Sequence, residues 1–585
     1  MSAPSVAQTS PAATTAEAPA ASDVDAKIEA ARREVKELRE EMRAQLATAS
    51  AAQGWQEDWV EEKRKLELFS IDGYLRVRPD LFFKFDLGRP ADDAGFTLFP
   101  RSPVSNSERT NAGVNMRFRF EPTINVSEEV RIRMQIDALD NLIWGSTPEY
   151  AYSRNGPAYW PDRYDLSVFS STQVPQRSGI NSLQDSIAVK RVWGEVSTPV
   201  GILRFGRMGS HWGTGILHND GNGIDNDWGD TVDRVMFTAE PLSGFYITPM
   251  LDFNSEGTGA LRLPEGGQPF DVSNSDEAHS YILAAARRDT DSEAKAKLDS
   301  GQAVFNYGLH FTYRNQRNDP TALNQAFTTD GTNLTGSNGT HVFRDANLFM
   351  PDLWAKYERK SFRIEAELAA IMGWLKPFST AAADRNIEVW QFGGVLQGEY
   401  KFLNGDLEVG GEAGFASGDN TAGMGNYPRR KGSGPNGATK AGDIDGPQWD
   451  CQSATNCNDR VIRNFRFNRD HRVDMILYRE ILGGVTDSFY LKPRISYRIT
   501  QGFNVFLAGI YSRAIYAEST PLGTDPNLGV ELNGGAKYET EDGFYAQVQY
   551  GILFPLAGLG KLDATGTAVP LDFAQALRAN IGIKF

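Results

Sequence analysis

The feature that most constrains this chain is a long alternation of apolar and polar residues. From position 114 to 138, even-numbered positions are almost all apolar on both sides of a short turn at 127–129. The positions between them carry charged side chains in mid-run, among them Arg117 and Arg133. Because successive side chains of a strand point to opposite faces, this pattern predicts a β-hairpin with one apolar and one hydrated face.

The length of the alternation separates this hairpin from a soluble sheet. Soluble sheets also alternate, but their strands usually have about 5–6 residues. Here each strand has about ten residues or more, the length that crosses a bilayer at a tilt. Charged residues in mid-strand are typical of a water-filled barrel interior. The sequence contains no run of about 18 apolar residues that would form a transmembrane helix.

The same hairpin unit recurs along the chain. Short turns occur at STPVG, PLSG, RKS, LNGD, TQG and EDG. Long polar connections lie between the hairpins, at 144–183, 209–231, 256–277, 317–345 and 419–482. Short turns on one side and long loops on the other are typical of outer-membrane barrels, whose strand number is even. We therefore predict an all-β fold, a transmembrane antiparallel β-barrel of about 18 strands over residues 70–585.

Aromatic residues near the predicted strand ends fit the same interpretation. In a membrane barrel, such residues form girdles at the two bilayer interfaces. The candidates are Trp144, Tyr313, Trp374, Trp390, Tyr400 and Tyr497.

One segment complicates the strand count. The stretch VDMILYREIL within residues 465–484 has the composition of a strand or a helix. A single extra strand would make the count odd and would place the turns TQG and EDG on the outer side. We therefore assign 465–484 to a long loop, as a helix folded into the pore; a pair of further strands is the alternative.

The N-terminal residues have a different composition. Residues 1–22 are rich in Ala, Pro and Thr, which predicts a disordered linker. Residues 23–69 carry apolar residues at heptad spacing, which predicts a periplasmic helix or a short coiled coil that joins protomers. A helix that packs on its own domain is the alternative. The start lacks the charged and apolar regions of a signal peptide, so we expect that this peptide has already been removed.

Charge and cysteine content limit the partners and the compartment. The formal net charge of -15 argues against nucleic acid as a partner. The two cysteines, Cys451 and Cys457, lie close together in a polar stretch. This arrangement fits one local disulfide in an oxidising compartment, with two free thiols as the alternative.

The chain ends in a further alternating stretch, ALRANIGIKF. Ile581, Ile583 and Phe585 share one parity, and Arg578 and Lys584 share the other. We expect this stretch to be the last strand, paired with the first strand near residues 74–87 to close the barrel. Arg578 and Lys584 would then face the lumen.

At this point the chain resembles a Gram-negative outer-membrane porin. The terminal strand ending in Phe585, with Ile583 and Ile581, is similar to the signal read by the barrel-assembly machinery. The hairpin VWGEVSTPVGILRFGR is similar to a Gly-x-x-x-x-Gly-Arg strand pair of porins, and a long acidic loop follows it in the position of their third loop. The stretch FNRDHRVDMILYREILGG resembles that of alginate-export barrels and of poorly characterised porin-like families. The resemblance implies an outer-membrane location, with lipid as the surroundings and the N-terminal helix in the periplasm.

Ten arginines have the parity of the hydrated face and are the candidate pore-lining residues: Arg76, Arg78, Arg117, Arg119, Arg131, Arg133, Arg204, Arg363, Arg494 and Arg498. In porins a basic wall faces an acidic third loop, and the field between them orients solutes. The candidate acids of such a constriction loop are Asp220, Asp225, Asp227, Asp230 and Asp233. As the alternative, the arginines pair with strand acids such as Asp80 and Asp137 and fill a polar interior.

Other chemistry has little support in the sequence. The stretch DGNGIDND offers oxygen ligands for Ca²⁺ at Asp220, Asn222, Asp225 and Asp227, but it lacks the full EF-hand spacing. A solvated acidic loop is the alternative, and no other cofactor is expected. There is no nucleophile elbow, phosphate loop or zinc motif, so we do not expect an enzyme.

Together these patterns predict a porin for passive diffusion of small hydrophilic solutes, with arginines that favour anions or sugars. We expect a homo-oligomer, for which a trimer is one arrangement. One alternative is a channel for a specific polyanion or polysaccharide. Another is a plugged structural or adhesive barrel, tethered by its N-terminal helix.

Overall fold

The structure is a computed structural model. It describes residues 68–90, 98–99, 108–144, 187–255, 260–262, 270–271, 277–320, 341–376, 386–420, 424, 461–563 and 565–585. The chain divides into two units, Met1–Glu67 and Leu68–Phe585, and every described residue belongs to the second. The predicted linker, all but the last two residues of the predicted N-terminal helix, and both cysteines lie outside the described residues.

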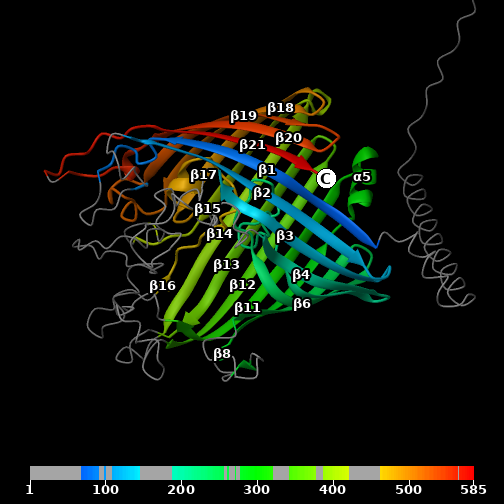
Figure 1. The fold of residues 1–585 in the computed structure, drawn as a ribbon. Helices are drawn as coiled ribbons and strands as arrows, with labels where there is room; N and C mark the ends of the chain where they lie inside the picture. The colour runs from blue at the N-terminus through cyan, green and yellow to red at the C-terminus, as the bar shows by residue number, and fades with distance from the viewer. Residues whose placement is uncertain are drawn as a thin grey trace, which may run out of the picture. The chain divides into compact units, whose positions relative to one another are not determined.

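Eighteen long strands of the described chain form one antiparallel sheet that closes on itself (Figure 1). The strands are β1 (Phe69–Phe83), β2 (Thr110–Asn125), β3 (Val130–Ile143), β4 (Ile187–Thr198), β5 (Gly201–Gly209), β6 (Thr231–Leu242), β7 (Phe245–Ser255), β10 (Ala278–Arg287), β11 (Val304–Pro320), β12 (His341–Arg359), β13 (Phe362–Leu375), β14 (Ile387–Phe402), β15 (Leu407–Ala416), β17 (Ser488–Thr500), β18 (Phe503–Ala514), β19 (Asn527–Glu539), β20 (Phe544–Pro555) and β21 (Ala574–Lys584). The prediction of an antiparallel barrel with about 18 strands is confirmed.

Three further short strands of the described chain lie outside this ring. Strand β16 (Val461–Ile462) pairs in parallel with β14. Strands β8 (Ala260–Arg262) and β9 (Phe270–Asp271) pair with each other in a separate two-stranded sheet.

The connections differ at the two ends of the barrel. At one end the strands are joined by short turns, one of which contains the 3₁₀ turn η5 (Leu403–Gly405). The link between β10 and β11 at this end forms a helix that we had not predicted, α5 (Asp291–Asp299), which begins with a capping box of Thr290 and Glu293. The C-terminus lies at the same end as α5 (Figure 1). Long connections lie at the other end, and one of them contains the 3₁₀ turn η7 (Ala557–Leu559).

The first and last strands close the ring as the sequence predicted. The register pairs Tyr74 with Lys584 and Phe83 with Gln575. The backbone N–H of Gly73 donates to the Phe585 carbonyl at 3.0 Å, and the N–H of Phe585 donates back at 3.1 Å. Because every long strand has a neighbour on both sides, the sheet has no free edge.

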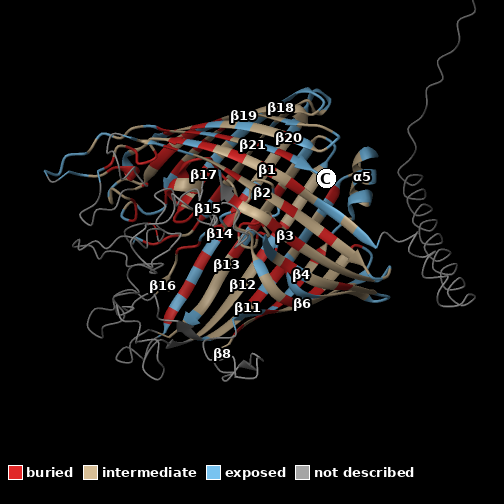
Figure 2. Cartoon of the chain, in the orientation of Figure 1, coloured by how far each residue is buried: buried red, intermediate tan, exposed pale blue. Residues whose placement is uncertain are grey.

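The barrel is apolar on the outside and polar on the inside, and burial alternates clearly along strands such as β1, β10 and β21 (Figure 2). Ile581 and Ile583 on β21 are 48% and 50% exposed, while Arg578, which has the opposite parity, is buried. Among the described residues, no helix combines the length and the apolar character needed to cross a bilayer.

Two rows of aromatic rings run across adjacent strands on part of the outer surface. At the long-loop end, the ring centroids of Tyr281, Tyr313, Phe349 and Trp374 follow one another at 6.2, 5.2 and 5.9 Å. At the short-turn end, Tyr357 lies between Phe305 and Phe362 at 6.5 and 6.4 Å. These rows are the girdles that the sequence indicated, and further exposed aromatics near strand ends are Trp144, Trp390, Tyr400 and Tyr497.

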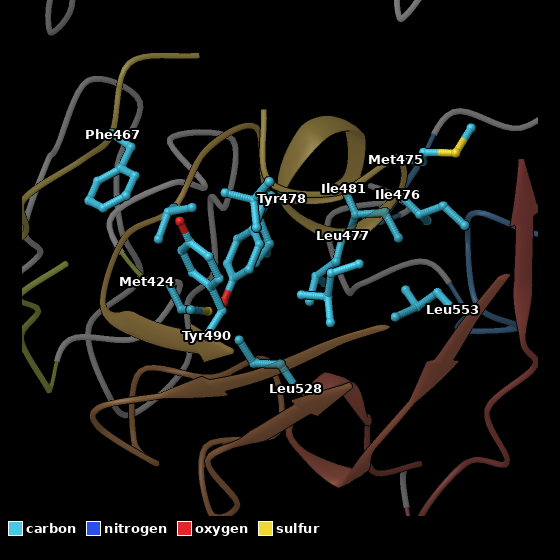
Figure 3. Packing of buried hydrophobic residues seen from close by; sticks show 14 of the residues in the cluster. Met424, Phe467, Met475, Ile476, Leu477, Tyr478, Ile481, Tyr490, Leu528 and Leu553 are labelled. Carbon is cyan, nitrogen blue, oxygen red and sulfur yellow. The ribbon is translucent and has the colours of Figure 1, made fainter. Parts of the chain in front are cut away.

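Residues 461–487 do not add a strand across the barrel wall. They contain only β16 and a single π-helical turn, η6 (Leu477–Ile481). Tyr478 packs near Tyr490 of β17, with ring centroids 5.9 Å apart, within a buried apolar cluster (Figure 3). The assignment of 465–484 to a long loop is therefore confirmed, although its helical part is shorter than we predicted.

The first strand ends earlier than its alternation suggested. We expected the first strand to continue to about residue 87, but β1 stops at Phe83 and Lys84 has φ of 57°. The chain turns there, and Phe85 stacks on Phe82 at 4.4 Å. Phe85 and Leu87 are buried, because at this point they pack with other apolar residues of the long-loop end.

Candidate functional site

Loop 210–230 folds into the barrel and brings an acid to three arginines of the wall. The Asp227 carboxylate accepts a hydrogen bond from Arg78 at 2.8 Å. It also pairs with Arg76 and Arg117, each at 3.3 Å. The side chains of Arg76 and Arg117 are 0% exposed. A buried cation needs such partners, because desolvation penalises an unpaired charge strongly.

The strand register explains why these arginines meet. Arg76 of β1 lies directly opposite Arg117 of β2, and both face the interior. Two like charges at opposite positions of a strand pair repel each other. Asp227 lies between them and Asp140 pairs with Arg117 at 2.6 Å, so the acids compensate the repulsion.

A second acid of the same loop connects the wall to residues 461–487. Asp225 pairs with Arg479 at 2.7 Å and with Arg78 at 3.3 Å. Arg578 of β21 pairs with Glu480 at 3.1 Å and with Asp80. Loop 210–230, residues 461–487 and strands β1, β2 and β21 therefore share one network of ion pairs.

Electrostatics keep both loop acids ionised. Burial would raise the pKa of Asp227, but the guanidinium groups of Arg78, Arg76 and Arg117 outweigh it and hold the pKa well below its usual range. Burial likewise acts to raise the pKa of Asp225, and Arg479, Arg578 and Arg78 outweigh it.

The two inner segments are also joined through backbone groups. The Asp470 carboxylate accepts the N–H groups of Asp227, Trp228 and Gly229 at 3.2, 3.0 and 2.6 Å. The guanidinium of Arg469 lies 3.9 Å from the centroid of the Trp228 ring. Loop 210–230 is thus held from the wall side by arginines and from the other side by Asp470.

The remaining predicted loop acids have other roles. Asp220 accepts a bond from the Asn222 amide at 2.7 Å, and its carbonyl accepts one from Arg191 at 2.6 Å. Burial raises the pKa of Asp230, which accepts bonds from the Asn219 N–H and the Asn468 amide.

Asp233 does not lie in the loop. It belongs to β6, where the alternation directs it outward, and it pairs with Arg207 at 2.7 Å on the exposed side. Its neighbour Arg234 faces inward and pairs with Asp252 at 2.5 Å. The strand therefore begins two residues before the position that we had assigned to the loop.

The ten candidate arginines divide into two groups. Arg76, Arg78, Arg117 and Arg119 come together and are buried, with Arg119 bonded to Asp137 at 2.6 and 2.8 Å. The other six lie on inward-facing positions and are less buried: Arg131, Arg133, Arg204, Arg363, Arg494 and Arg498.

Several arginines of the second group have acidic or aromatic neighbours. Glu195 pairs with Arg204 at 2.8 Å and lies 3.9 Å from Arg133. Arg498 pairs with Asp406 at 2.6 Å. Arg494 lies 5.7 Å from the centre of the Phe506 ring.

The oxygens proposed to bind Ca²⁺ contact protein groups in the structure. Asn222 accepts bonds from Gln135 and Arg191, each at 2.9 Å, and Asp225 and Asp227 face guanidinium groups. Among the described residues, no group of three or more His, Cys, Asp or Glu is placed to hold a metal ion.

The sequence did not predict the charged partners that residues 461–487 supply to loop 210–230 and to the barrel wall. Asp470, Arg479 and Glu480 all come from that segment. Their only signal in the sequence is the presence of charged residues within an otherwise apolar stretch, which indicates buried partners but does not identify them.

Comparisons with known proteins find solved structures that are similar to this chain. No protein-family model matches the chain, and no curated protein matches it. Solved structures that resemble it include OpdQ of Pseudomonas aeruginosa, with 7% identity, a TM-score of 0.43 and coverage of 89% of this chain and 98% of that one. OccK9 (OpdG) of the same species has 13% identity, a TM-score of 0.43 and coverage of 89% and 99%. A BenF-like porin from Pseudomonas fluorescens has 9% identity, a TM-score of 0.41 and coverage of 89% and 99%.

The chain thus folds as a closed 18-stranded antiparallel β-barrel, and the solved structures that resemble it are Gram-negative outer-membrane porins. At these identities and TM-scores, the function has to be argued from the residues of this chain itself.

Proposed function

We propose that this protein is an outer-membrane channel through which small hydrophilic solutes diffuse passively. The closed sheet supports this proposal, because a barrel satisfies all of its backbone hydrogen bonds without water and can stand in lipid. Its exposed apolar surface, with two aromatic rows, matches a bilayer and its interfaces. Its interior carries charged side chains, as a water-filled passage requires.

The main observation in support of a preference for anionic solutes is the cluster of Arg76, Arg78 and Arg117 around Asp227. Fixed charges in a narrow passage with walls of low dielectric act strongly on ions. We propose that the arginines of the wall favour anionic or sugar-like solutes. The inward-facing arginines of the second group extend this basic surface toward the short-turn end.

Planar-bilayer recordings of the purified protein test this function. We expect discrete conductance steps and a reversal potential that indicates anion preference in a salt gradient. Changing Arg117, Arg119, Arg131 and Arg133 to Ala should reduce the anion preference. A trace that stays closed at every voltage would contradict the channel, and unchanged selectivity would remove these arginines from the mechanism.

One observation favours a second candidate, a plugged structural or adhesive barrel. Loop 210–230 contacts both Arg76 and Arg117, and the two side chains are 0% exposed. Uptake of sugars by liposomes that contain the protein separates the two candidates. A plugged barrel gives no swelling, whereas a channel, including one for a specific polyanion, admits at least small solutes.

The assembly of the protein is a further part of the proposal. We propose that the barrel-assembly machinery reads the terminal strand that ends in Phe585, so that the short turns and the N-terminal region lie in the periplasm. We also propose that the heptad pattern of residues 23–69 supports a homo-oligomer. Chemical crosslinking of the full chain and of a chain without residues 23–68 tests this, and a monomer in both cases contradicts it.

A further inference from the structure

Both segments that fill the interior are fastened to the wall through buried glutamates. Glu367 of β13 accepts the Thr214 hydroxyl at 2.6 Å, the Gly215 N–H at 3.0 Å and the Thr214 N–H. Glu531 of β19 accepts the N–H groups of three consecutive residues, Met475, Ile476 and Leu477, at 2.8, 3.1 and 3.0 Å. In each case one wall carboxyl group holds one turn of an inner segment.

Each wall glutamate has a second carboxyl group beside it. Asp352 of β12 lies within hydrogen-bonding reach of Glu367, and both residues are 0% exposed. Asp474 directly precedes Met475, whose N–H group Glu531 accepts, and it is buried as well. Asp474 accepts the N–H groups of Tyr478 and Arg479, each at 3.0 Å, within the same turn.

The hydrogen bonds of the first pair are incomplete without a proton. Both carboxyl oxygens of Asp352 and the Oε1 atom of Glu367 are buried, and no donor among the described groups bonds to them. Two carboxylates are both acceptors, so they cannot bond to each other when both are ionised. A single proton on Asp352, donated to Oε1 of Glu367, gives two of these three oxygens a hydrogen bond and removes the repulsion of two buried like charges.

The basic groups around the first pair are engaged elsewhere or neutral. Arg234 of β6 pairs with Asp252. Burial, together with the charges of Arg234 and His211, lowers the pKa of His218 to about 4, so its imidazole is neutral at neutral pH. The other titratable or charged groups that face the pair are His310 of β11, opposite Asp352, Glu365 and Arg363 of β13, Arg288 at the Trp354 ring, and His471 at the Thr214 carbonyl.

The second pair has a different setting. Arg479 is directed to Asp225, and Lys492 of β17 donates to the Arg472 carbonyl at 3.3 Å. The remaining charged or titratable groups near the turn are Glu412, Tyr478, Asp487 and Tyr490. Burial raises the pKa of Asp474 to about 6, although the N–H groups of Tyr478 and Arg479 and the charge of Lys492 oppose the shift.

We propose that each inner segment is clamped to the barrel wall by a carboxyl pair that holds one proton, Asp352 with Glu367 and Asp474 with Glu531, and that loss of this proton releases the segment. This inference concerns the regulation of the passage and rests on the proposed channel function. Since a buried pair binds the proton more tightly than separated carboxyl groups in water, the clamp is strongest at acidic pH. It weakens as the pH rises above the ordinary carboxyl range, because burial raises the pKa of Asp474.

The experiment measures release in two ways on the full chain, from about pH 5 to about pH 9. Single-channel conductance in planar bilayers reports the width of the passage. Reaction of a thiol reagent with Leu477→Cys or Ile216→Cys, in a chain with Cys451 and Cys457 changed to Ser, reports exposure of each segment. Thr565→Cys, on the long-loop side, corrects for the pH dependence of the reagent.

The expected result is a rise of both signals with pH. Release of one proton per segment increases the released fraction by up to about tenfold per pH unit. In the double variant D352N/D474N, both signals stay at their acidic level, because the amide introduced at position 352 donates to Glu367 and the amide oxygen at position 474 still accepts N–H bonds. D563N is the matched control, since Asp563 also accepts backbone N–H bonds but is exposed, and it keeps the wild-type rise.

Signals that do not change with pH in the wild type, or that still rise in D352N/D474N, overturn the clamp. If the double variant does not give a heat-modifiable, folded band, E367Q/E531Q provides the same test. These changes remove the other carboxyl group of each pair, so two like charges no longer face each other. The channel proposal fails separately: thiol exposure that rises with pH while no current flows retains the clamp and rejects the channel.

Discussion

At the scale of single residues, Asp227 is the most consequential side chain of the interior. Among the described acids, it is the one in contact with Arg76, Arg78 and Arg117 at once. Asp227 therefore offsets much of the positive charge of these three arginines in the structure.

Asp227→Asn should destabilise the folded barrel. Removing one partner of a buried ion pair leaves the other charges uncompensated, at a cost of about 3–5 kcal/mol. Asp233→Asn is the matched control, because its pair with Arg207 is exposed and contributes about 0–1 kcal/mol. Denaturant unfolding in lipid vesicles measures both, and an equal effect of the two changes would contradict the role of Asp227. In bilayers, Asp227→Asn should also shift the reversal potential toward stronger anion preference.

The two loop acids in the arginine network should keep it intact well into the acidic range. Their pKa values are lowered, so their contribution to stability is complete above the ordinary carboxyl range and is lost only as the pH falls below it. We expect Asp227→Asn to cost the same free energy of unfolding at about pH 6 as at about pH 5, an interval in which the inner segments stay clamped. A cost that disappears over that interval would show that Asp227 is not held by its arginines.

At the scale of elements, the conformation of loop 210–230 depends on a few backbone positions. Gly229 has φ of 51°, and a Cβ atom there would lie 2.4 Å from the Asp220 carbonyl oxygen. Both the left-handed conformation and the close approach favour glycine. The N–H of Gly229 also donates to Asp470, so this one residue joins the loop to residues 461–487.

Gly229→Ala should destabilise the protein more than Gly301→Ala, because Gly301 has open space around it. Gly301 has φ of 80°, and nothing lies within 4 Å of its added Cβ, so Gly301→Ala carries only the backbone strain of about 1 kcal/mol. Gly229→Ala adds a steric clash to this strain. Differential unfolding measurements should show the larger loss for Gly229→Ala, and recordings should show a higher conductance. Similar losses at both positions would mean that the contact with Asp220 is unimportant.

At the scale of the whole molecule, the barrel separates an apolar outside from a charged inside. Leu283 of β10 is 50% exposed on the outer surface. Ser496 of β17 lies on an inward-facing position, opposite Glu408. The two positions should respond in opposite ways to the same charged side chain.

Leu283→Arg should destabilise the barrel in lipid by about 2–4 kcal/mol if the outer surface faces the bilayer centre. Ser496→Arg should change the free energy of unfolding little, because the new charge is hydrated and faces Glu408. Folding titrations in vesicles measure the difference. Equal tolerance of arginine at both positions would contradict a membrane-spanning barrel.

The alternation of the strands was readable from the sequence because it is local. Each side chain of β2 or β21 shows by its parity which face it takes, and the closure by Phe585 followed from the same rule. The limits of this rule are visible at Phe85, where the chain turns and apolar residues find partners inside. They are also visible at Asp233, where the strand begins earlier than the polar composition suggested.

The sequence by itself therefore determined the barrel, its approximate strand number, the ends with short and long connections, and ten of the inward-facing arginines. Only the tertiary structure decided what those arginines contact. Asp227, Arg479 and Glu531 come from segments far apart in the chain, and no periodicity relates them. The physical reason is that alternation depends on the geometry of one strand, whereas the pairing of buried charges depends on which loops the closed barrel can enclose.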